Sequence, residues 1–329
     1  MNTQRKAASV FDRKFRKRSG TINLEKFKHG SYWSDRIFRL LVYVLLFDLV
    51  FVFLFPFMYM FITSLKTDAD LMDITVKWIP KTLKFSNYKM ALRYLDAATG
   101  LKNSVLVTGL AVLGHILSCS FIAYGFARYK FPGRSMLFAL VIVSFIVPAQ
   151  TIIVPQYIRY ASLRWTNSYK PLIIPTFMGF GLKGGLFIFI FRQFFLGVPK
   201  ELEEAAIIDG CGSFKTYFAI ILPIARSSIL VSAVLAMVWH WNDYFEPTIY
   251  ITKTQKYLLP QMLPSMYEMM KMEKQTLPFD PLTMTTVERT LNEAVVMAGT
   301  VIVILPLLIT YLFLQRHFLQ GIERTGLVE

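Results

Sequence analysis

The stretch Glu204-Ala205-Ala206-Ile207-Ile208-Asp209-Gly210, closed by Ile220-Ile221-Leu222-Pro223, decides the fold. It lies between two strongly apolar segments and is too polar to belong to either. The two flanks therefore predict membrane spans, and the stretch itself predicts a polar loop that joins them outside the bilayer.

The composition is that of a membrane protein. Hydrophobic residues make up 54% and charged residues 17% of the 329 residues, and the mean hydropathy is +0.46. This apolar excess is larger than a soluble domain of the same length needs to fill its core. We therefore expect an all-α polytopic membrane protein, because helices satisfy their own backbone groups in lipid.

Much of the formal net charge of +15 lies in the first forty residues. Only Phe11 and Phe15 are interleaved with the densest basic run. An orientation signal that also attracts anionic lipid heads is therefore favoured over a nucleic-acid-binding arm. We predict a basic cytosolic tail over residues 1–36 and a transmembrane domain over residues 37–329.

Six apolar runs approach the ~20 residues that a bilayer requires. The predicted transmembrane helices are 40–62, 105–127, 137–158, 177–196, 229–251 and 294–314. Small residues predict a central place for the second span, and Pro148 and Pro155 predict that the third lines a cavity. Six spans place both termini on one side. The basic tail, the turn at Arg128 and the end at Arg316 assign that side to the cytosol.

The loop over residues 199–223 is expected to form two short helices around a turn. Pro199 is suited to the first turn of a helix, and three acidic residues favour the positive end of its dipole: Glu201, Glu203 and Glu204. Gly210 and Gly212 permit a sharp reversal of the backbone. A second, amphipathic helix is predicted by Phe214, Tyr217, Phe218 and Ile221. Pro223 is expected to separate it from the fifth span.

The first of these helices has the character of a docking element. Ala205 and Ala206, with Ile208, offer a low-relief face that can enter a groove on another protein. For residues 214–221 alone, an interfacial helix that only anchors the loop to lipid heads is an equal alternative.

The spacing Glu-Ala-Ala, three residues, Gly, nine residues, Ile-x-Leu-Pro is similar to the signature (EAA) loop of ATP-binding-cassette (ABC) importer permeases, which that family places between the fourth and fifth spans. Further similarity lies in Asn103-Ser104, Phe131-Pro132-Gly133-Arg134, Val147-Pro148, Ile153-Val154-Pro155, Pro171-Leu172-Ile173-Ile174-Pro175, Arg192-Gln193-Phe194-Phe195, Pro199-Lys200-Glu201-Leu202 and Trp241-Asn242-Asp243. From the first span to the C-terminus the chain resembles the carbohydrate-uptake branch, in particular the maltose-type second permease subunit.

The resemblance implies a type I importer (MetI-like) fold in the bacterial plasma (inner) membrane. It also implies a second permease subunit, two ATPase subunits and an external solute-binding protein. The residues that it assigns to ATPase coupling are Glu204, Ala205, Ala206, Asp209, Gly210, Cys211, Phe214, Leu222 and Pro223. The chain departs from the family by its long basic tail and by Cys211, where a small residue such as alanine is usual.

No chemistry of its own is predicted for the chain. It contains no phosphate-binding Gly-x4-Gly-Lys-[Ser/Thr] string, so ATP and Mg²⁺ are expected to be used by the partner ATPase. Neither the scattered histidines, His29, His115, His240 and His317, nor the two cysteines, Cys119 and Cys211, have the spacing of a metal site. We expect no bound cofactor, no metal and no catalysis.

Polar residues at membrane depth are the candidates for a solute pathway. They are Gln150, Trp239, Asn242, Asp243 and Glu246. Intramembrane carboxylates usually face a polar cavity or a partner, and aromatic faces with amide and carboxylate acceptors suit sugar hydroxyls. Packing against a second permease, or capping of helices, is an equal alternative for this group.

The leading hypothesis is a permease subunit of an ABC importer for a carbohydrate, with an oligosaccharide as the expected substrate and the signature loop as the link to the ATPase. One alternative is an autonomous secondary transporter or channel, in which Asp243 would serve ion coupling. Another is an ABC permease for an amino acid, a phosphonate or a polyamine.

Overall fold

The computed structural model describes residues 32–181, 183–276 and 293–326, and no strand occurs among them. The chain divides into residues 1–59 and residues 60–329. Most of the predicted basic tail lies outside the described residues.

The first unit is described by most of helix α2 (Tyr32–Ser64), which continues into the second unit. Its apolar side chains are exposed, with Phe38 and Phe53 at 67% and 70%. Residues Arg36–Ser64 are long and apolar enough to cross a membrane. The first predicted span lies within this helix.

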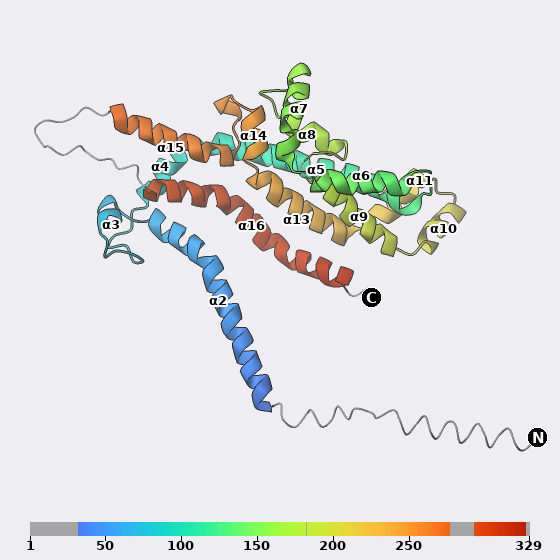
Figure 1. Ribbon diagram of the computed structural model, residues 1–329, viewed down its shortest axis with the longest axis horizontal. Coiled ribbons are helices and arrows are strands. Elements are labelled where there is room, and N and C mark those ends of the chain that lie inside the picture. The colour runs from blue at the N-terminus through green and yellow to red at the C-terminus, as the bar shows by residue number, and fades with distance from the viewer. Residues whose placement is uncertain (1–31, 182, 277–292, 327–329) are drawn as a thin grey trace, which may run out of the picture. The chain divides into compact units, whose positions relative to one another are not determined.

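Helix α5 (Ala97–Arg128) is the centre of the second unit, as its small residues predict. It packs on α8 (Lys170–Phe177), α9 (Gly184–Gly197) and α13 (Arg226–Asn242). Figure 1 shows α9 and α13 running along it. Cys119 and Ala123 of α5 and Phe187 and Phe191 of α9 are fully buried in the shared core.

A second layer closes the other end of this unit. Helix α4 (Ser86–Tyr94) and α15 (Leu259–Thr276) pack on α16 (Glu293–Gly326), which also lies along α13. Leu95, Met266 and Ala298 are buried where these helices meet. The indole Nε1 of Trp241 donates a hydrogen bond to the Val303 carbonyl at 3.0 Å, which joins α13 to α16.

The predicted outer loop after the first span is partly folded. It contains α3 (Asp68–Met72) and α4. The Lys66 ammonium donates to the carbonyls of Val76 and Lys77, each at 2.9 Å, and Lys84 pairs with Asp68 at 2.9 Å. α5 then begins eight residues before the second predicted span, at Ala97.

Three helices among the described residues are long and apolar enough to span a membrane without a break, or up to five if each of two bent pairs is one span. The unbroken ones are Arg36–Ser64, Ala97–Arg128 and Glu293–Gln315, which contain the first, second and sixth predicted spans.

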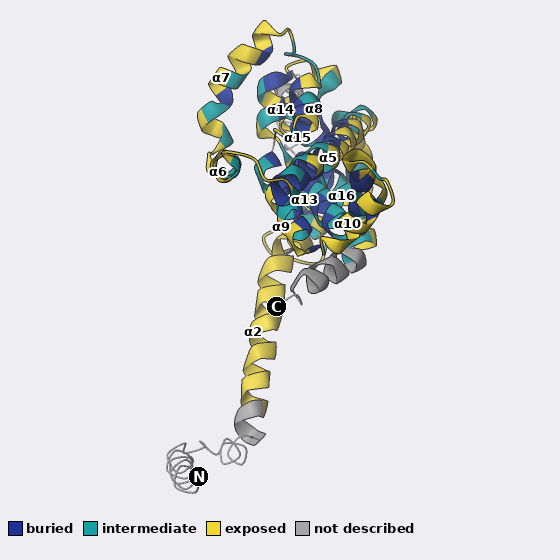
Figure 2. Cartoon of the chain, turned by 90° about the vertical axis from the view of Figure 1, so that its right-hand side faces the viewer, coloured by how far each residue is buried: buried dark blue, intermediate teal, exposed yellow. Residues whose placement is uncertain are grey.

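The structure corrects the third predicted span. Helix α6 (Arg134–Ile146) and α7 (Ala149–Ser162) form one of the bent pairs, with 99° between them. Val147 and Pro148 are both extended. For Val147 the cause is Pro148, because a proline disfavours the helical conformation of the residue before it. Figure 2 shows α7 projecting from the neighbouring helices.

The fourth and fifth predicted spans are also corrected. Residues 178–181 and 183 are not helical, so α9 has only 14 residues. The segment before them forms α8, with Leu172 and Thr176 buried. The fifth span ends as a helix at Asn242, and α14 (Phe245–Tyr250) follows as a separate turn.

Candidate functional site

The signature stretch forms α10 (Glu201–Ile208) and the turn after it. The helix begins two residues later than Pro199 predicts, because the Lys200 carbonyl accepts the first hydrogen bonds, from the amides of Glu203 and Glu204 at 2.9 and 3.1 Å. Glu201, Glu203 and Glu204 all lie in the first turn, where the helix dipole favours acidic side chains. In Figure 1, α10 lies near one end of the second unit and α14 lies well away from it.

The exposed face of α10 differs from the predicted one. Ala206 is 2% exposed and is therefore buried within the chain. Ile207 and Ile208 are 64% and 85% exposed, and Glu204, Ala205 and Asp209 are exposed as well. The face available to a partner is therefore formed by Ala205, Ile207 and Ile208, and Ala206 is not part of it.

The turn after α10 needs a glycine at Gly210. Its φ of +79° lies in the left-handed region, and the Gly210 amide donates to the Ile207 carbonyl at 3.0 Å while the Cys211 amide donates to the Ala206 carbonyl at 2.9 Å. These two bonds are the Schellman pattern that closes a helix on a left-handed glycine. Gly212 has φ −72° and ψ 162°, which any residue can adopt, so the reversal does not depend on it.

The second half of the loop is helical from Ser213 to Ile224 and carries a π-helical turn over Tyr217–Ile221. The predicted separation at Pro223 is wrong, since Pro223 lies inside α12 (Leu222–Ile224). The amide of Leu222 donates to the Tyr217 carbonyl, five residues back. The break comes at Ala225, and the helices on either side of it are bent by 76°.

The predicted second helix is present, but the four residues that predicted its apolar side are not all buried. Tyr217 and Ile221 are 1% and 0% exposed, whereas Phe214 and Phe218 are 69% and 54% exposed. Of the remaining predicted coupling residues, Cys211 and Leu222 are half-buried and Pro223 is exposed.

Three residues of α5 hold the loop, and they are spaced four apart on one face of that helix. Ser120 Oγ lies 2.7 Å from Tyr217 Oη, and Tyr124 Oη donates to Glu203 Oε2 at 3.4 Å. Arg128 donates to the Val198 carbonyl at 2.6 Å, just before α10. We call Ser120, Tyr124 and Arg128 the α5 stripe.

The strongest contact of the α5 stripe is an ion pair. Arg128 Nε lies 2.6 Å from Glu203 Oε1, and their side chains are 5% and 15% exposed. Screening by water is weak at such a site, so the pair fixes the position of α10 against the end of α5. The α5 stripe could not be predicted from the sequence. Its four-residue spacing was visible, but nothing local pointed to a loop about eighty residues away.

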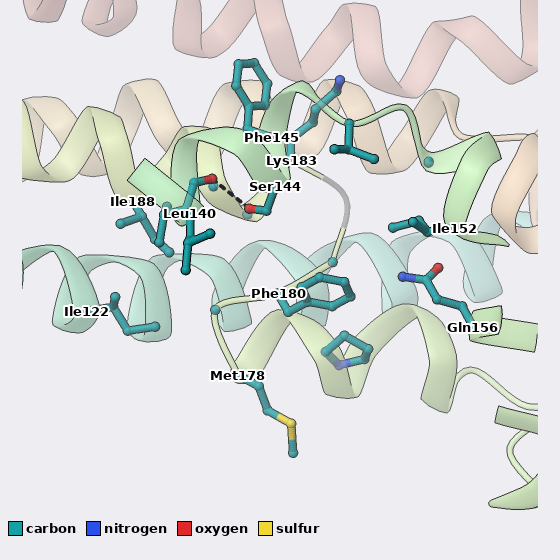
Figure 3. Close-up of a pocket in the computed structure, with 18 of the residues that line it drawn as sticks. Ile122, Leu140, Ser144, Phe145, Ile152, Gln156, Met178, Phe180, Lys183 and Ile188 are labelled. Atoms are coloured by element: carbon teal, nitrogen blue, oxygen red, sulfur yellow. Dashed lines mark hydrogen bonds between the residues drawn. The ribbon is translucent and has the colours of Figure 1, made fainter. Parts of the chain in front are cut away.

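A cavity of about 490 Å³ opens between α6, α7, α8 and α9 and reaches α14. Figure 3 shows Gln156 and Ile152 on one side of it and Leu140 and Ile188 on the other, with Lys183 above Phe180. Most of its lining is apolar. Its polar members include Ser144, Gln156, Lys183 and Glu246.

Of the five predicted pathway residues, Glu246 lines this cavity. Gln150 is exposed and outside it. Asn242 donates to the Val238 carbonyl of its own helix at 2.9 Å. The Asp243 carboxylate accepts from the amides of Phe245 and Glu246 at 3.0 and 3.3 Å, so it caps α14, which is the alternative role given above.

Trp239 also lies outside the cavity lining, although it is close to it. Its ring lies 5.9 Å from that of Phe187, and Lys183 Nζ lies 5.7 Å from its centroid and 5.3 Å from that of Phe145. The structure adds Gln156, whose Oε1 accepts from Tyr250 Oη at 3.2 Å.

Two of the histidines meet inside the second unit. His115 Nε2 of α5 and His240 Nε2 of α13 are 3.1 Å apart, and both side chains are buried. Cys119 Sγ lies 3.6 Å from His115 Nδ1. Among the residues that the structure describes, no three His, Cys, Asp or Glu side chains are arranged to hold a metal ion.

These features define a helical protein with apolar membrane-spanning helices, an exposed helix closed by a glycine, and a cavity between helices. Residues 116–324 match the family model described as "Binding-protein-dependent transport system inner membrane component". The chain belongs to this family, which is a family of transport proteins.

Similarity to curated proteins covers most of the chain. It is 28% identical over 272 residues to the arabinooligosaccharides transport system permease protein AraQ of Halalkalibacterium halodurans, covering 80% of this chain and 88% of AraQ. It is 29% identical over 261 residues to the probable starch degradation products transport system permease protein AmyC of Thermoanaerobacterium thermosulfurigenes, covering 79% and 86%.

A solved structure has the same fold. It is a crystal structure of a bacterial ABC transporter involved in the import of the acidic polysaccharide alginate. The superposition has a TM-score of 0.70 at 23% identity and covers 87% of this chain and 98% of that one. The expected type I ABC importer permease fold is confirmed.

Proposed function

We propose that this chain is the permease subunit through which a bacterial ABC importer passes a carbohydrate, with an oligosaccharide as the substrate class. The proposal is supported by relatives that cover about four fifths of the chain and are described as permeases for arabinooligosaccharides and for starch degradation products. A second permease completes the path, a solute-binding protein delivers the sugar, and two ATPase subunits hydrolyse ATP.

The observation that carries the coupling role is the exposure of α10. Ile208 is 85% exposed at the last turn of a helix whose other side is held by Arg128. A large apolar side chain that projects outside the membrane spans favours a protein partner over water. The ATPase subunit is the partner that the family supplies, and Ala205 leaves room for it to approach the helix.

Movement of α10 would reach the membrane by two routes. One runs through the Arg128–Glu203 ion pair into α5. The other runs through the continuous helical segment Ser213–Ile224 to the bend at Ala225 and into α13. Both α5 and α13 pack in the central core, so a displacement of the loop would reorient them together and alternate access to the path.

The cavity between α6, α7, α8 and α9 is the candidate part of the solute path on this subunit. Its apolar surface with a few polar groups is the usual character of a small-molecule site. Gln156 and Glu246 supply hydrogen-bonding groups for hydroxyls, and both line the cavity. We assign the termini and α10 to the cytosol, in agreement with the basic turn that includes Arg128.

An autonomous secondary transporter is not favoured, because the chain belongs to a binding-protein-dependent family and Asp243 caps a helix. Purification of the tagged chain from its native membrane tests the assembly. We expect an ATPase and a second permease to accompany it, and a homo-oligomer alone would contradict the proposal. Binding of oligosaccharides, amino acids and polyamines to the co-purified or genetically linked solute-binding protein then decides the substrate class.

A further inference from the structure

A second cavity, of about 390 Å³, lies where the turn after α5 meets α6 and α9. Its lining consists of Lys130, Phe131, Arg134, Ser135, Phe138 and Arg192. Three of these six side chains are cationic and none is acidic. We call it the basic cavity. Its residues have no part in the coupling contacts described above.

The three cations of the basic cavity lack a carboxylate partner among the described residues. Arg192 packs its guanidinium on the Phe138 ring, 4.1 Å from the centroid, and its Nε is buried without a hydrogen-bond partner. Arg134 donates to the Tyr129 carbonyl at 3.2 Å. Three like charges around one space repel one another, and a bound anion would relieve that repulsion.

The backbone adds to the positive potential. α6 has 13 residues and begins at Arg134, so the amides of its first turn face the same end of the helix as Arg134 and Ser135. A helix N-terminus favours phosphate and other anions through these amides and the helix dipole. The Ser135 side chain is exposed and supplies a hydroxyl donor beside the arginines.

The setting of the basic cavity selects a lipid as the source of the anion. The turn directly follows the membrane-spanning helix α5, which ends at Arg128. Beyond the cavity, α6 has no buried residue, and Met136, Leu137 and Leu140 are 70%, 48% and 53% exposed. An anionic headgroup in the cavity would therefore have an apolar helix surface beside it for its acyl chains.

We propose that the basic cavity binds the phosphodiester headgroup of an anionic phospholipid, with Lys130, Arg134 and Arg192 as the charged contacts. Bidentate contacts from the two arginines suit a phosphate group, and basic pockets between helices at the membrane surface bind such headgroups. Since Arg192 lies on α9, five residues before the helix end at Gly197, bound lipid would fix the α6–α9 contact next to the coupling loop.

The test measures phospholipid retention by the assembled transporter, purified with its partner subunits. Native mass spectrometry counts bound phosphatidylglycerol and phosphatidylcholine in mixed micelles of known composition. The variants are Arg192→Gln, Arg134→Gln and Lys130→Gln. The matched control is Lys215→Gln, which removes one charge from an exposed lysine of the coupling loop outside the cavity.

We expect the wild type to retain phosphatidylglycerol selectively. Each lost charge of the cavity should weaken phosphatidylglycerol binding about fivefold, since a basic residue near an anionic surface contributes roughly 1 kcal/mol to binding. Lys215→Gln should leave retention unchanged, and Arg192→Lys should retain most of the binding. If an arginine variant does not assemble, the exposed Lys130→Gln carries the test, because removing its charge does not alter the packing.

Titration with inorganic phosphate distinguishes the two sources of the anion. Retention of phosphatidylglycerol that persists in millimolar phosphate supports a lipid site. Displacement by phosphate with equal retention of both lipids would overturn the lipid assignment. Equal retention by the wild type and by a variant that lacks all three charges would show that the basic cavity does not bind lipid. An acidic surface of a partner subunit would then be its occupant.

Discussion

Arg128 Nε and Glu203 Oε1 lie 2.6 Å apart, and this ion pair joins the last residue of α5 to the first turn of α10. Arg128 also donates to the Val198 carbonyl at 2.6 Å. One side chain therefore positions both α10 and the segment that leads into it. The contact gives the exposed α10 a rigid attachment to the most central helix of the second unit.

Glu203→Gln should loosen α10. Removing one partner of a buried ion pair costs about 3 kcal/mol or more, because the remaining charge stays in a site with little water. We expect faster amide exchange over residues 201–208 and less substrate transported per ATP hydrolysed. Both are measured with the assembled complex in proteoliposomes.

Glu201→Gln is the control for this variant, since Glu201 lies in the same helical turn but is exposed. It should transport normally. In the double variant Arg128→Gln/Glu203→Gln, the defect in transport per ATP should be smaller than the summed defects of the two single variants. A defect equal to that sum would mean that the two residues are not coupled. Normal transport by Glu203→Gln would count against the role of the pair.

Gly210→Ala should uncouple transport from ATP hydrolysis, and a bulkier residue should do so more strongly. The left-handed conformation that the turn requires costs a residue with a Cβ about 1–2 kcal/mol of conformational free energy. An added Cβ at Gly210 meets nothing within 4 Å, so the effect comes from the backbone and not from a clash. The measurement is the ratio of uptake to ATP hydrolysis, with membrane insertion checked separately.

Gly212→Ala is the matched control, because Gly212 has ordinary backbone angles and also has open space around it. We expect it to behave as the wild type. Equal impairment of both variants would show that the loop needs flexibility in general, and would refute the specific role of the Gly210 conformation.

The cavity residues should affect transport without affecting the ATPase contact. Gln156→Ala and Glu246→Ala each remove a group that can hydrogen-bond a hydroxyl, so we expect uptake at low substrate concentration to fall by a factor of about 2–10. Gln150→Ala, on the exposed side of α7, should have no such effect. If Gln150→Ala were the more damaging change, the path would run along the outer face of α7.

Trp241→Phe should lower stability modestly. It removes the buried hydrogen bond to the Val303 carbonyl and keeps an aromatic ring, so the expected cost is about 1 kcal/mol. Thermal unfolding of the assembled complex measures it. Trp165→Phe serves as the control, because phenylalanine preserves the stacking on Tyr160, where the ring centroids are 5.5 Å apart. An unchanged midpoint of thermal unfolding for Trp241→Phe would mean that the hydrogen bond to the Val303 carbonyl does not hold α13 to α16.

The elements that could be predicted are those with a strong local signal. The small residues of the second span placed α5 at the centre, and the glycine after Glu-Ala-Ala marked the left-handed turn at Gly210. The acidic first turn of α10 and the helical conformation of residues 213–221 also followed from the local sequence. Each of these features depends on neighbours a few residues apart in sequence.

The features that could not be predicted depend on distant partners or on how helices end. Proline at position 148 marked a disturbance, but only the three-dimensional packing decides that α6 and α7 diverge by 99°. The burial of Ala206 and the Arg128–Glu203 pair depend on residues far from α10 in sequence. Likewise, the local sequence left a pathway role and helix capping as equal alternatives for Asp243, and its two hydrogen bonds to the backbone of α14 became visible only in the structure.

The most direct test of the central claim, that α10 docks on the ATPase, is site-specific crosslinking in the assembled complex. Cysteine replaces Ile208, which is 85% exposed, in a chain carrying Cys211→Ser, while the buried Cys119 is retained. Thr248→Cys, exposed on α14 and well away from α10, is the control. We predict that a short bifunctional reagent joins position 208 to the ATPase subunit and that position 248 gives no such product. Crosslinks to the ATPase from position 248, with none from position 208, would contradict the account.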